Sequence, residues 1–415
     1  MSLGKLLATH HATVFSPCMS SILFINRVYP PEDGATGRVL EHMAKGLVKE
    51  GWKVSVLTTS GGTSRPGTTF SDGVKIIRVG GLFSKRSLIS RALGYALMIP
   101  MFFFKATLLP RFDFIVTKTD PPMLLLIAPL LRLIKGSRLI HWAQDLYPEV
   151  AVELGVFKSG GAMTQFLFFV SSLAMRIHER VIVVGRCMVP RVLARGVLPE
   201  RIAVIANTGV EQDIVPVEHA SNPFRRKYGL EGYFVVEYSG NLGRAHEFET
   251  VIQAARRLEH TGENKILFLV IGGGPGRAEF MAQVGELGLN NVRFLEAQSA
   301  VQLGESLAAA DAHLVTMKTA MEGLVVPSKF YGVLAVGKPC LFVGPAGSEV
   351  ARVISEFGVG AVISPGDVSE FVTTILKYRN DPQLIESSRV HAEMFLRNQD
   401  SLRQFINSLL PLTVT

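Results

Sequence analysis

A carboxylate and two lysines lie close together in residues 311–339, DAHLVTMKTAMEGLVVPSKFYGVLAVGKP. The segment reads as a strand, a turn that contains Glu322 and Gly323, and then a helix. The first backbone amides of a helix are free to bind an anion, and Lys318 and Lys329 add two ammonium groups beside them. A carboxylate next to cations and free amides suits a ligand that joins sugar hydroxyl groups to a diphosphate.

A second group of polar residues follows the strand predicted at 234–240. The sequence SGNLGRAH, residues 239–246, places small and amide residues beside Arg244 and His246. Backbone amides together with a guanidinium form a diphosphate site, although an ordinary surface loop is the alternative. The next predicted strand ends in GGGP, residues 272–275, where glycines let a ligand approach the backbone closely.

Several other chemistries are disfavoured by the motifs that the sequence lacks. No GxGxxG follows the first strand and no GxxxxGK[ST] is present, which argues against a dinucleotide dehydrogenase and a P-loop enzyme. No Asp-x-Asp element is present to carry a divalent cation, so we predict neither a metal site nor a cofactor. The three cysteines (Cys18, Cys187 and Cys340) are far apart, which argues against a disulfide framework and favours a reducing compartment.

The elements that must position these residues have the pattern of an α/β protein. Residues 21–26 form an apolar run, a turn-rich loop follows, and residues 36–50 have their apolar side chains on one helical face. Another strand comes at 53–59, which completes the opening of a Rossmann-like unit. Further strands are predicted at 74–79, 112–118, 137–143 and 180–185.

The same pattern restarts near residue 234, so the 415 residues divide into two doubly wound domains that face a central cleft. We predict an N-terminal domain over 1–205 and a C-terminal domain over 206–394, joined by the polar, proline-containing segment 207–223. Residues 1–18 read as a tail, because the chain restarts at Met19 as a strand. The C-terminal stretch, 395–415, is expected to pack back on the N-terminal domain.

The net charge of +8 is unevenly distributed: residues 1–205 carry +13 and residues 206–415 carry −5. A basic half suggests an anionic partner, namely a phosphorylated ligand or a membrane surface. Nucleic acid is disfavoured because no run of Lys and Arg is interleaved with aromatic residues. The mean hydropathy of +0.29 excludes a disordered or fibrous chain.

Two apolar segments, 92–104 and 159–175, are too short or too diluted with polar residues to span a bilayer. For 159–175 we favour a helix in the protein core over one that lies in a membrane interface. For the segment around 92–104 both interpretations stay open, because lysines and arginines flank it.

Residues 311–339 resemble the donor-sugar motif of family 4 retaining glycosyltransferases, which have the GT-B fold. Glu322, Gly323 and Gly337-Lys338-Pro339 match the pattern, while Gly332 stands where the family has a second Glu. The resemblance extends over nearly the whole chain. GATGR, residues 34–38, is similar to the glycine loop that approaches the donor diphosphate. HWAQDLYPE, residues 141–149, resembles the acceptor-side motif of the polysaccharide and O-antigen branch, with Gln144 where the family commonly has His.

The resemblance implies roles for individual residues. Glu322, Arg244, Lys318 and Asp145 are the implied catalytic residues. The implied donor-binding residues are Gly34, Gly37, Gly240, Asn241, His246, Gly273, Gly274, Gly323, Leu324, Val325 and Lys329. His141 is as well explained by a core position as by the site. Because Gly332 lacks a side chain, we hypothesise that Glu349, at a predicted helix start, accepts the hydrogen bonds of the ribose; stabilisation of that helix start is the alternative.

These observations together predict a metal-independent retaining glycosyltransferase. It would transfer a sugar from a nucleotide diphosphate donor, with a UDP-sugar as the expected class, to a lipid-linked saccharide at the cytoplasmic face of a bacterial inner membrane. Attachment to the anionic membrane surface would be peripheral. Two alternatives are a UDP-sugar epimerase of the same fold and a non-catalytic, membrane-associated partner of a polysaccharide assembly complex.

Overall fold

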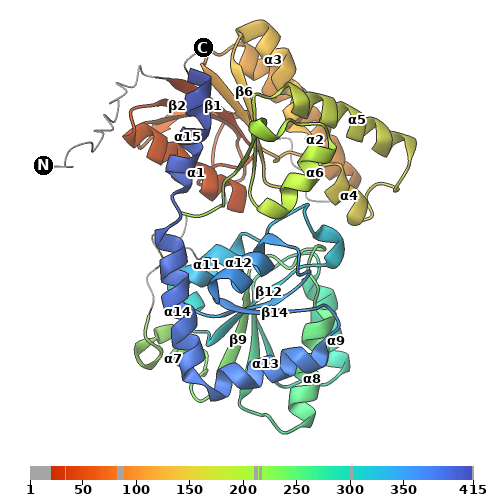
Figure 1. The fold of residues 1–415 in the computed structure, drawn as a ribbon, viewed down its shortest axis with the longest axis vertical. Coiled ribbons are helices and arrows are strands. Elements are labelled where there is room, and N and C mark those ends of the chain that lie inside the picture. Colours follow the sequence, from red (N-terminus) through yellow and green to blue (C-terminus); the bar gives the residue numbers. More distant parts are fainter. Residues whose placement is uncertain are drawn as a thin grey trace, which may run out of the picture.

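The computed structural model describes residues 20–32, 34–81, 88–209, 214, 217–299 and 302–413. Within these ranges the chain forms one mostly parallel and one fully parallel sheet, each covered by helices, which lie one above the other in Figure 1. The fold is therefore two Rossmann-like α/β units, as predicted from the sequence. The expected tail, residues 1–18, lies outside the described residues.

The N-terminal sheet has eight strands in the order β3-β4-β2-β1-β5-β6-β7-β8. The strands are β1 (Ser21–Ile25), β2 (Lys53–Thr59), β3 (Gly67–Ser71), β4 (Val74–Val79), β5 (Phe114–Thr117), β6 (Arg138–Ala143), β7 (Arg180–Val183) and β8 (Ile202–Val204). All neighbouring pairs are parallel except β3–β4. The edge strand β3 was not predicted, because GTTFS is exposed along its whole length and has no apolar alternation.

Helices cover both faces of this sheet. They are α1 (Ala35–Lys49), α2 (Leu88–Thr107), α3 (Ile127–Lys135), α4 (Glu149–Glu153), α5 (Ala162–Ile177) and α6 (Val189–Ala194), with the 3-10 turns η1 (Leu124–Leu126), η2 (Arg186–Met188) and η3 (Pro199–Arg201). Helix α1 buries Val39, Leu40, Met43 and Leu47, which is the face expected from the spacing of its apolar residues.

The C-terminal sheet is entirely parallel, in the order β11-β10-β9-β12-β13-β14. Its strands are β9 (Phe234–Ser239), β10 (Ile266–Ile271), β11 (Val292–Leu295), β12 (Ala312–Thr316), β13 (Cys340–Val343) and β14 (Gly360–Ile363). The helices are α7 (Pro223–Lys227), α8 (Glu249–His260), α9 (Arg277–Glu286), α10 (Leu303–Ala308), α11 (Lys329–Ala335), α12 (Glu349–Phe357) and α13 (Val368–Asn380), with η4 (His219–Ser221) and η6 (Thr319–Met321).

The last two helices, α14 (Pro382–Arg397) and α15 (Ser401–Thr413), run alongside both sheets in Figure 1. Helix α15 packs on the N-terminal sheet, where the Phe405 ring lies 6.0 Å from the ring of Phe24 and 5.5 Å from that of Trp142. Phe405 and Leu409 are fully buried in the N-terminal core. The C-terminus of the chain thus completes the domain that its N-terminus begins.

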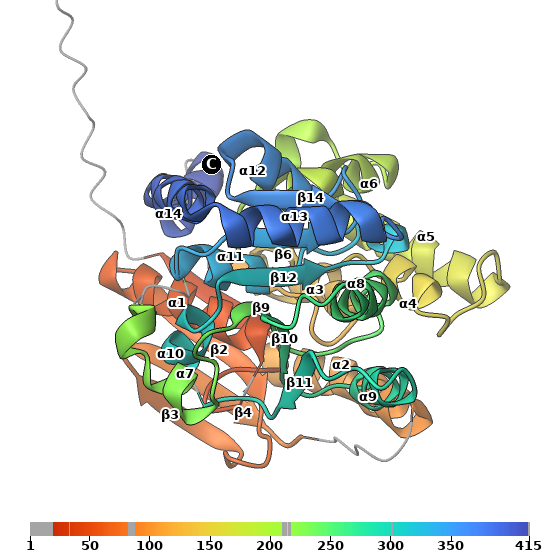
Figure 2. The same cartoon turned by 90° about the horizontal axis from the view of Figure 1, so that it is seen from below.

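Our prediction of a core helix for residues 159–175 was wrong. Helix α5 exposes Met163, Phe166 and Phe169, and it projects from the side of the N-terminal sheet in Figures 1 and 2. The other apolar segment, in α2, divides its described side chains between the two environments, since Met98 and Phe102 are buried in the core and Leu97 and Phe104 are exposed. No helix in the described ranges has both the length and the apolar character needed to cross a bilayer.

Candidate functional site

Glycines hold the loops after β9 and β10 against each other at the carboxyl edge of the C-terminal sheet. A Cβ on Gly272, whose φ is +127°, would lie 2.1 Å from the carbonyl oxygen of Gly240. A Cβ on Gly274 would lie 2.6 Å from Oδ1 of Asn241, so both positions require glycine. Gly273 accepts a hydrogen bond from the Leu242 amide at 2.7 Å, and no atom lies within 4 Å of where its own Cβ would be. That open position leaves room for a ligand to approach the backbone.

Lys329, the first residue of α11, points its ammonium group at these loops. Its Nζ lies 3.6 Å from the centre of the Tyr238 ring and 3.4 Å from the Cβ position of Gly240. The Nζ is buried and has no hydrogen-bond partner among the described residues, and burial holds the pKa of this ammonium well below its usual value. An anionic ligand at the loops would supply the missing counter-charge.

His246 is held as a neutral ring on the same side of the sheet. Its Nδ1 lies 2.8 Å from the carbonyl oxygen of Thr316. Burial, with the charges of Lys329 and Lys318, lowers the pKa of His246 to about 3. His246 therefore carries no charge at neutral pH, whereas the side chains of Arg244 and Lys318 are exposed. The basic side chains available to a ligand are those of the two lysines and Arg244.

Glu322 follows η6 and directs its carboxylate toward the loop after β13. A Cβ on Gly347 would lie 2.0 Å from the Glu322 Oε1, so a glycine is needed where this loop passes the carboxylate. The Glu322 side chain is half-buried. The structure therefore brings Glu322 to the carboxyl edge of the same sheet as Lys329 and the glycine loops, as the sequence predicted.

The two motifs, one from each domain, meet through their backbones. The amide of Leu146 donates to the carbonyl oxygen of Leu324 at 3.0 Å, and Asp145 forms an antiparallel β-bridge with Val325. Gly323 has a φ of +74°, and a Cβ there would lie 2.8 Å from the carbonyl oxygen of Cys187 in the N-terminal domain. The segment 323–325 thus contacts the other domain, which leaves the donor role of Leu324 and Val325 a prediction.

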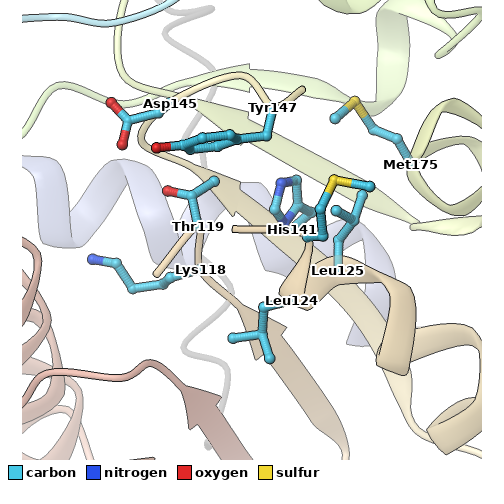
Figure 3. A pocket seen from close by; sticks show the side chains of 9 residues that line it. Lys118, Thr119, Leu124, Leu125, His141, Asp145, Tyr147 and Met175 are labelled. Carbon is cyan, nitrogen blue, oxygen red and sulfur yellow. The ribbon is translucent and has the colours of Figure 1, made fainter. Parts of the chain in front are cut away.

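Asp145 stands beside a buried lysine that the sequence analysis did not select. Figure 3 shows the Asp145 carboxylate and the Lys118 ammonium on one side of a small cavity, with Met175 on the other. Burial raises the pKa of Asp145 to about 6, with a further contribution from the charge of Asp120, and burial lowers the pKa of Lys118 to about 7. Both groups can therefore change protonation near neutral pH.

Lys118 links this pair to the glycine loop of the N-terminal domain. Its Nζ donates to the carbonyl oxygen of Thr36 at 3.1 Å and lies 4.1 Å from the centre of the Trp142 ring. The neighbouring glycines pack on Val28, because a Cβ on Gly34 or Gly37 would lie 2.9 or 3.0 Å from a Val28 methyl group. These glycines let the start of α1 approach the loop that follows β1 closely.

The side chains of Gln144 and His141 both have hydrogen-bond partners within the protein. Gln144 donates through Nε2 to the Asn207 Oδ1 at 3.1 Å, and Asn207 donates back at 2.6 Å, so the two amides form a closed pair. His141 is buried, its Nδ1 lies 3.1 Å from the carbonyl oxygen of Thr117, and burial lowers its pKa to about 3. Of the acceptor-motif residues considered, Asp145 therefore remains the one suited to contact a substrate.

Glu349 has a partner that the ribose hypothesis did not foresee. Its carboxylate accepts hydrogen bonds from the backbone amide of Arg186 at 2.5 Å and from the Arg186 Nε at 2.9 Å. The same guanidinium donates to Glu356 at 2.8 Å. Both oxygens of Glu349 are thus engaged across the domain boundary. The carboxylate therefore already joins the two domains, and its role toward the ribose stays a prediction.

The residues missed from the sequence are Lys118, Asn207, Arg186 and Tyr238. Lys118 had a usable signal, because a charged residue directly after a buried parallel strand lies at the edge where ligands bind. The other three contact residues that are distant in sequence, and no local pattern reveals such contacts.

In the described part of the chain, no cluster of three or more His, Cys, Asp or Glu side chains could hold a metal ion. Metal independence stays a prediction.

The fold consists of two facing Rossmann-like units. Glycine loops and cations lie at the edge of one unit, and a carboxylate motif lies at the edge of the other. These features are those of a glycosyltransferase of the GT-B class. Family comparisons agree. Residues 34–208 match the family described as "Glycosyl transferase 4-like domain", and residues 221–393 match "Glycosyl transferases group 1". The chain belongs to the family 4 glycosyltransferases.

Individual relatives and structures are similar along most of the chain. A probable glycosyltransferase of Pseudomonas aeruginosa, WbjE, is 30% identical over 68% of this chain and 70% of the relative. The putative colanic acid biosynthesis glycosyl transferase WcaI of Escherichia coli is 28% identical over 69% of this chain and 71% of the relative. The structure of Anabaena HepE in complex with UDP and glucose has a TM-score of 0.68 at 16% identity, covering 95% of this chain and 100% of that one.

Proposed function

We propose that this glycosyltransferase transfers a sugar from a UDP-sugar to a lipid-linked saccharide during the assembly of a bacterial polysaccharide. The observation that carries the proposal is the buried, unpartnered ammonium of Lys329 at the glycine loops. A buried cation without a partner is costly unless a ligand supplies the opposite charge, and a nucleotide diphosphate does so. The presence of UDP in the HepE complex supports this choice of donor class.

The reaction proceeds with retention of configuration. The bond between the anomeric carbon and the donor phosphate oxygen breaks, and the acceptor hydroxyl oxygen bonds to the same face of that carbon. The hydroxyl proton passes to the departing diphosphate. Lys329, Lys318 and Arg244 stabilise the negative charge that develops on this leaving group without a metal ion. Glu322 accepts hydrogen bonds from the sugar hydroxyls and orients the ring.

The acceptor approaches from the N-terminal domain, beside Asp145 and Lys118. Their shifted pKa values, about 6 and about 7, mean that the protonation of this pair, and with it the hydrogen bond that it offers to an acceptor hydroxyl, changes near neutral pH. The backbone contacts of Asp145 and Leu146 with residues 324–325 support a position of this carboxylate near the donor. Polysaccharide assembly as the process is supported by the similarity to WcaI, whose name refers to colanic acid.

The enzyme works as a peripheral protein at the cytoplasmic face of the bacterial inner membrane, where a lipid-linked acceptor is available. The net charge of +13 on residues 1–205 supports attraction to anionic lipid. Such attraction weakens as salt rises, because exposed charges are screened beyond about 10 Å at 0.1 M ionic strength.

Calorimetry and thermal unfolding with UDP and a panel of nucleotide sugars test the donor assignment. A ligand at a hundred times its dissociation constant stabilises the fold by about 2.7 kcal/mol, so binding is readily detected. Stabilisation by UDP-linked compounds, followed by sugar transfer to a lipid-linked saccharide, is the expected result. No stabilisation by any nucleotide contradicts the proposal, and turnover of a free UDP-sugar without acceptor favours the epimerase instead.

A further inference from the structure

Helix α5 has the reverse of the usual amphipathic pattern. Its buried residues are mostly small, namely Ser171, Ser172, Ala174 and Met175. Besides Ala162, Gln165, Phe168 and Arg176, its exposed residues include five large apolar ones: Met163 (61% exposed), Phe166 (59%), Phe169 (65%), Leu173 (49%) and Ile177 (37%). These five recur at intervals of three or four residues, so they line one side of the helix. A contiguous exposed apolar face of this size marks an interaction site.

Basic residues predominate on this face, although Glu153 and Glu179 adjoin it and Glu179 pairs with Arg132 at 3.1 Å. Residues 154–177, together with the adjoining segment 121–139, contain five basic residues and no Asp or Glu. Helix α3 adjoins α5, since Arg132 donates to the carbonyl oxygen of Ile177, and it adds the exposed side chains of Leu133 and Ile134. Large apolar side chains bordered by lysine and arginine match the boundary between the acyl chains and the headgroups of an anionic bilayer.

We infer that the α5 face and the exposed end of α3 are the surface by which this protein docks on an anionic membrane, with the aromatic side chains of α5 inserted among the lipids. The charge pattern favours lipid over a second protein, because a protein interface of this composition would need matching acidic groups on the partner. Docking there is a property of this surface and is independent of the transfer reaction.

The docking surface is joined to the acceptor motif by a buried arginine. Arg195 donates to the Ser171 hydroxyl of α5 at 3.3 Å and to the carbonyl oxygen of Tyr147 at 2.7 Å. Its guanidinium also pairs with Glu149 and lies 5.2 Å from the centre of the Phe168 ring. Membrane docking through α5 therefore holds the Asp145–Tyr147 loop at a fixed distance from the lipid. That consequence rests on the proposed function, which requires an acceptor carried by lipid.

Flotation of the full-length protein with vesicles tests the inference. Vesicles of phosphatidylcholine alone are compared with vesicles that also contain phosphatidylglycerol. The test variant is Phe166→Glu/Phe169→Glu, and the matched control, Phe70→Glu/Met394→Glu, makes the same change at exposed apolar residues on β3 and α14. The control should bind anionic vesicles as the wild type does. The test variant should bind them about tenfold more weakly or worse, because two inserted aromatic rings are lost.

A second measurement does not depend on the double variant. In Phe166→Trp, the emission of the new indole should shift to shorter wavelength on addition of anionic vesicles and stay constant on addition of UDP. UDP affinity, measured without lipid, should be equal in all variants.

Three results overturn the inference. The first is equal flotation of the test and control variants, and the second is no flotation of the wild type with any vesicle. The third is a wild type that binds no vesicles but forms a dimer that the test variant abolishes, which assigns the face to a second copy of the chain. If the protein binds vesicles as expected but does not bind UDP, the docking inference stands and only the proposed donor is refuted.

Discussion

Replacing Lys329 with Met separates the cost of burying its ammonium from the gain that a diphosphate provides. Methionine keeps most of the length of the side chain and can still pack on Tyr238, but it removes the charge. Without ligand the variant should be more stable than the wild type, because it no longer buries an unpartnered polar group, which costs about 1–3 kcal/mol. With ligand it loses a charge-assisted hydrogen bond worth about 1.5–3 kcal/mol, which lowers UDP affinity roughly ten- to a hundredfold.

The pH dependence gives an independent check on the same residue. The pKa of Lys329 in the folded protein lies well below 10.5, so between those two values the unfolded chain binds more protons. Stability of the ligand-free wild type should therefore rise with pH over that range, and the Lys329→Met variant should lack this contribution. UDP should also cause proton uptake above the lowered pKa, which appears as a dependence of the calorimetric binding enthalpy on the buffer.

Urea unfolding and calorimetry supply these measurements. Lys318→Met is the matched control, since Lys318 is an exposed lysine near the same loop and should lose less affinity and gain no stability. An affinity of Lys329→Met within about twofold of the wild type, together with unchanged stability, would refute the assignment of Lys329 to the diphosphate.

Four further substitutions have defined outcomes. Glu322→Gln should leave UDP affinity unchanged but lower turnover strongly, because its carboxylate holds sugar hydroxyls; normal turnover with a verified donor and acceptor removes it from the site. Glu349→Ala and Arg186→Ala, compared by UDP calorimetry, separate the two roles of that carboxylate: equal affinities assign it to the domain contact, whereas a loss of about ten- to a hundredfold only in Glu349→Ala assigns it to the ribose. Glu237→Met should stabilise the fold by about 1–3 kcal/mol at neutral pH, because both oxygens of that buried carboxyl lack partners and burial raises its pKa well above 4.5; the gain should shrink as pH falls toward 4.5, and a gain that is constant with pH contradicts this explanation.

The fold could be predicted because its central strands are buried on both faces and end in glycine or polar turns. The run VKIIRV coincides with β4. The run RVIVVG begins with β7, which ends two residues before the predicted strand does. Alternation of such runs with amphipathic helices leaves few topologies other than doubly wound sheets. Strand β3 escaped prediction because its pairing with β4 is set by the tight turn at Asp72–Gly73 and not by hydrophobic side chains.

The candidate site was predictable only where one motif holds its residues. Glu322 and Lys329 lie within eight residues of each other, and the strand–turn–helix pattern places both at the sheet edge. The partners of Glu349 and Gln144 come from the other domain and from the domain junction, and no periodicity encodes such contacts. Helix α5 was misjudged because apolar composition does not distinguish side chains buried in the core from side chains exposed on the surface.

The position of α15 affects how the chain folds during synthesis. Phe405 and Leu409 belong to the same buried cluster as Phe24 and Trp142, and the Arg180 side chain donates to the carbonyl oxygen of Ser408 at 3.0 Å. The first domain to leave the ribosome therefore lacks part of its core until the last segment of the chain emerges. The second domain, whose strands end at Ile363, can form earlier. A stop codon shortly before Ser401 would thus damage the domain encoded at the opposite end of the gene.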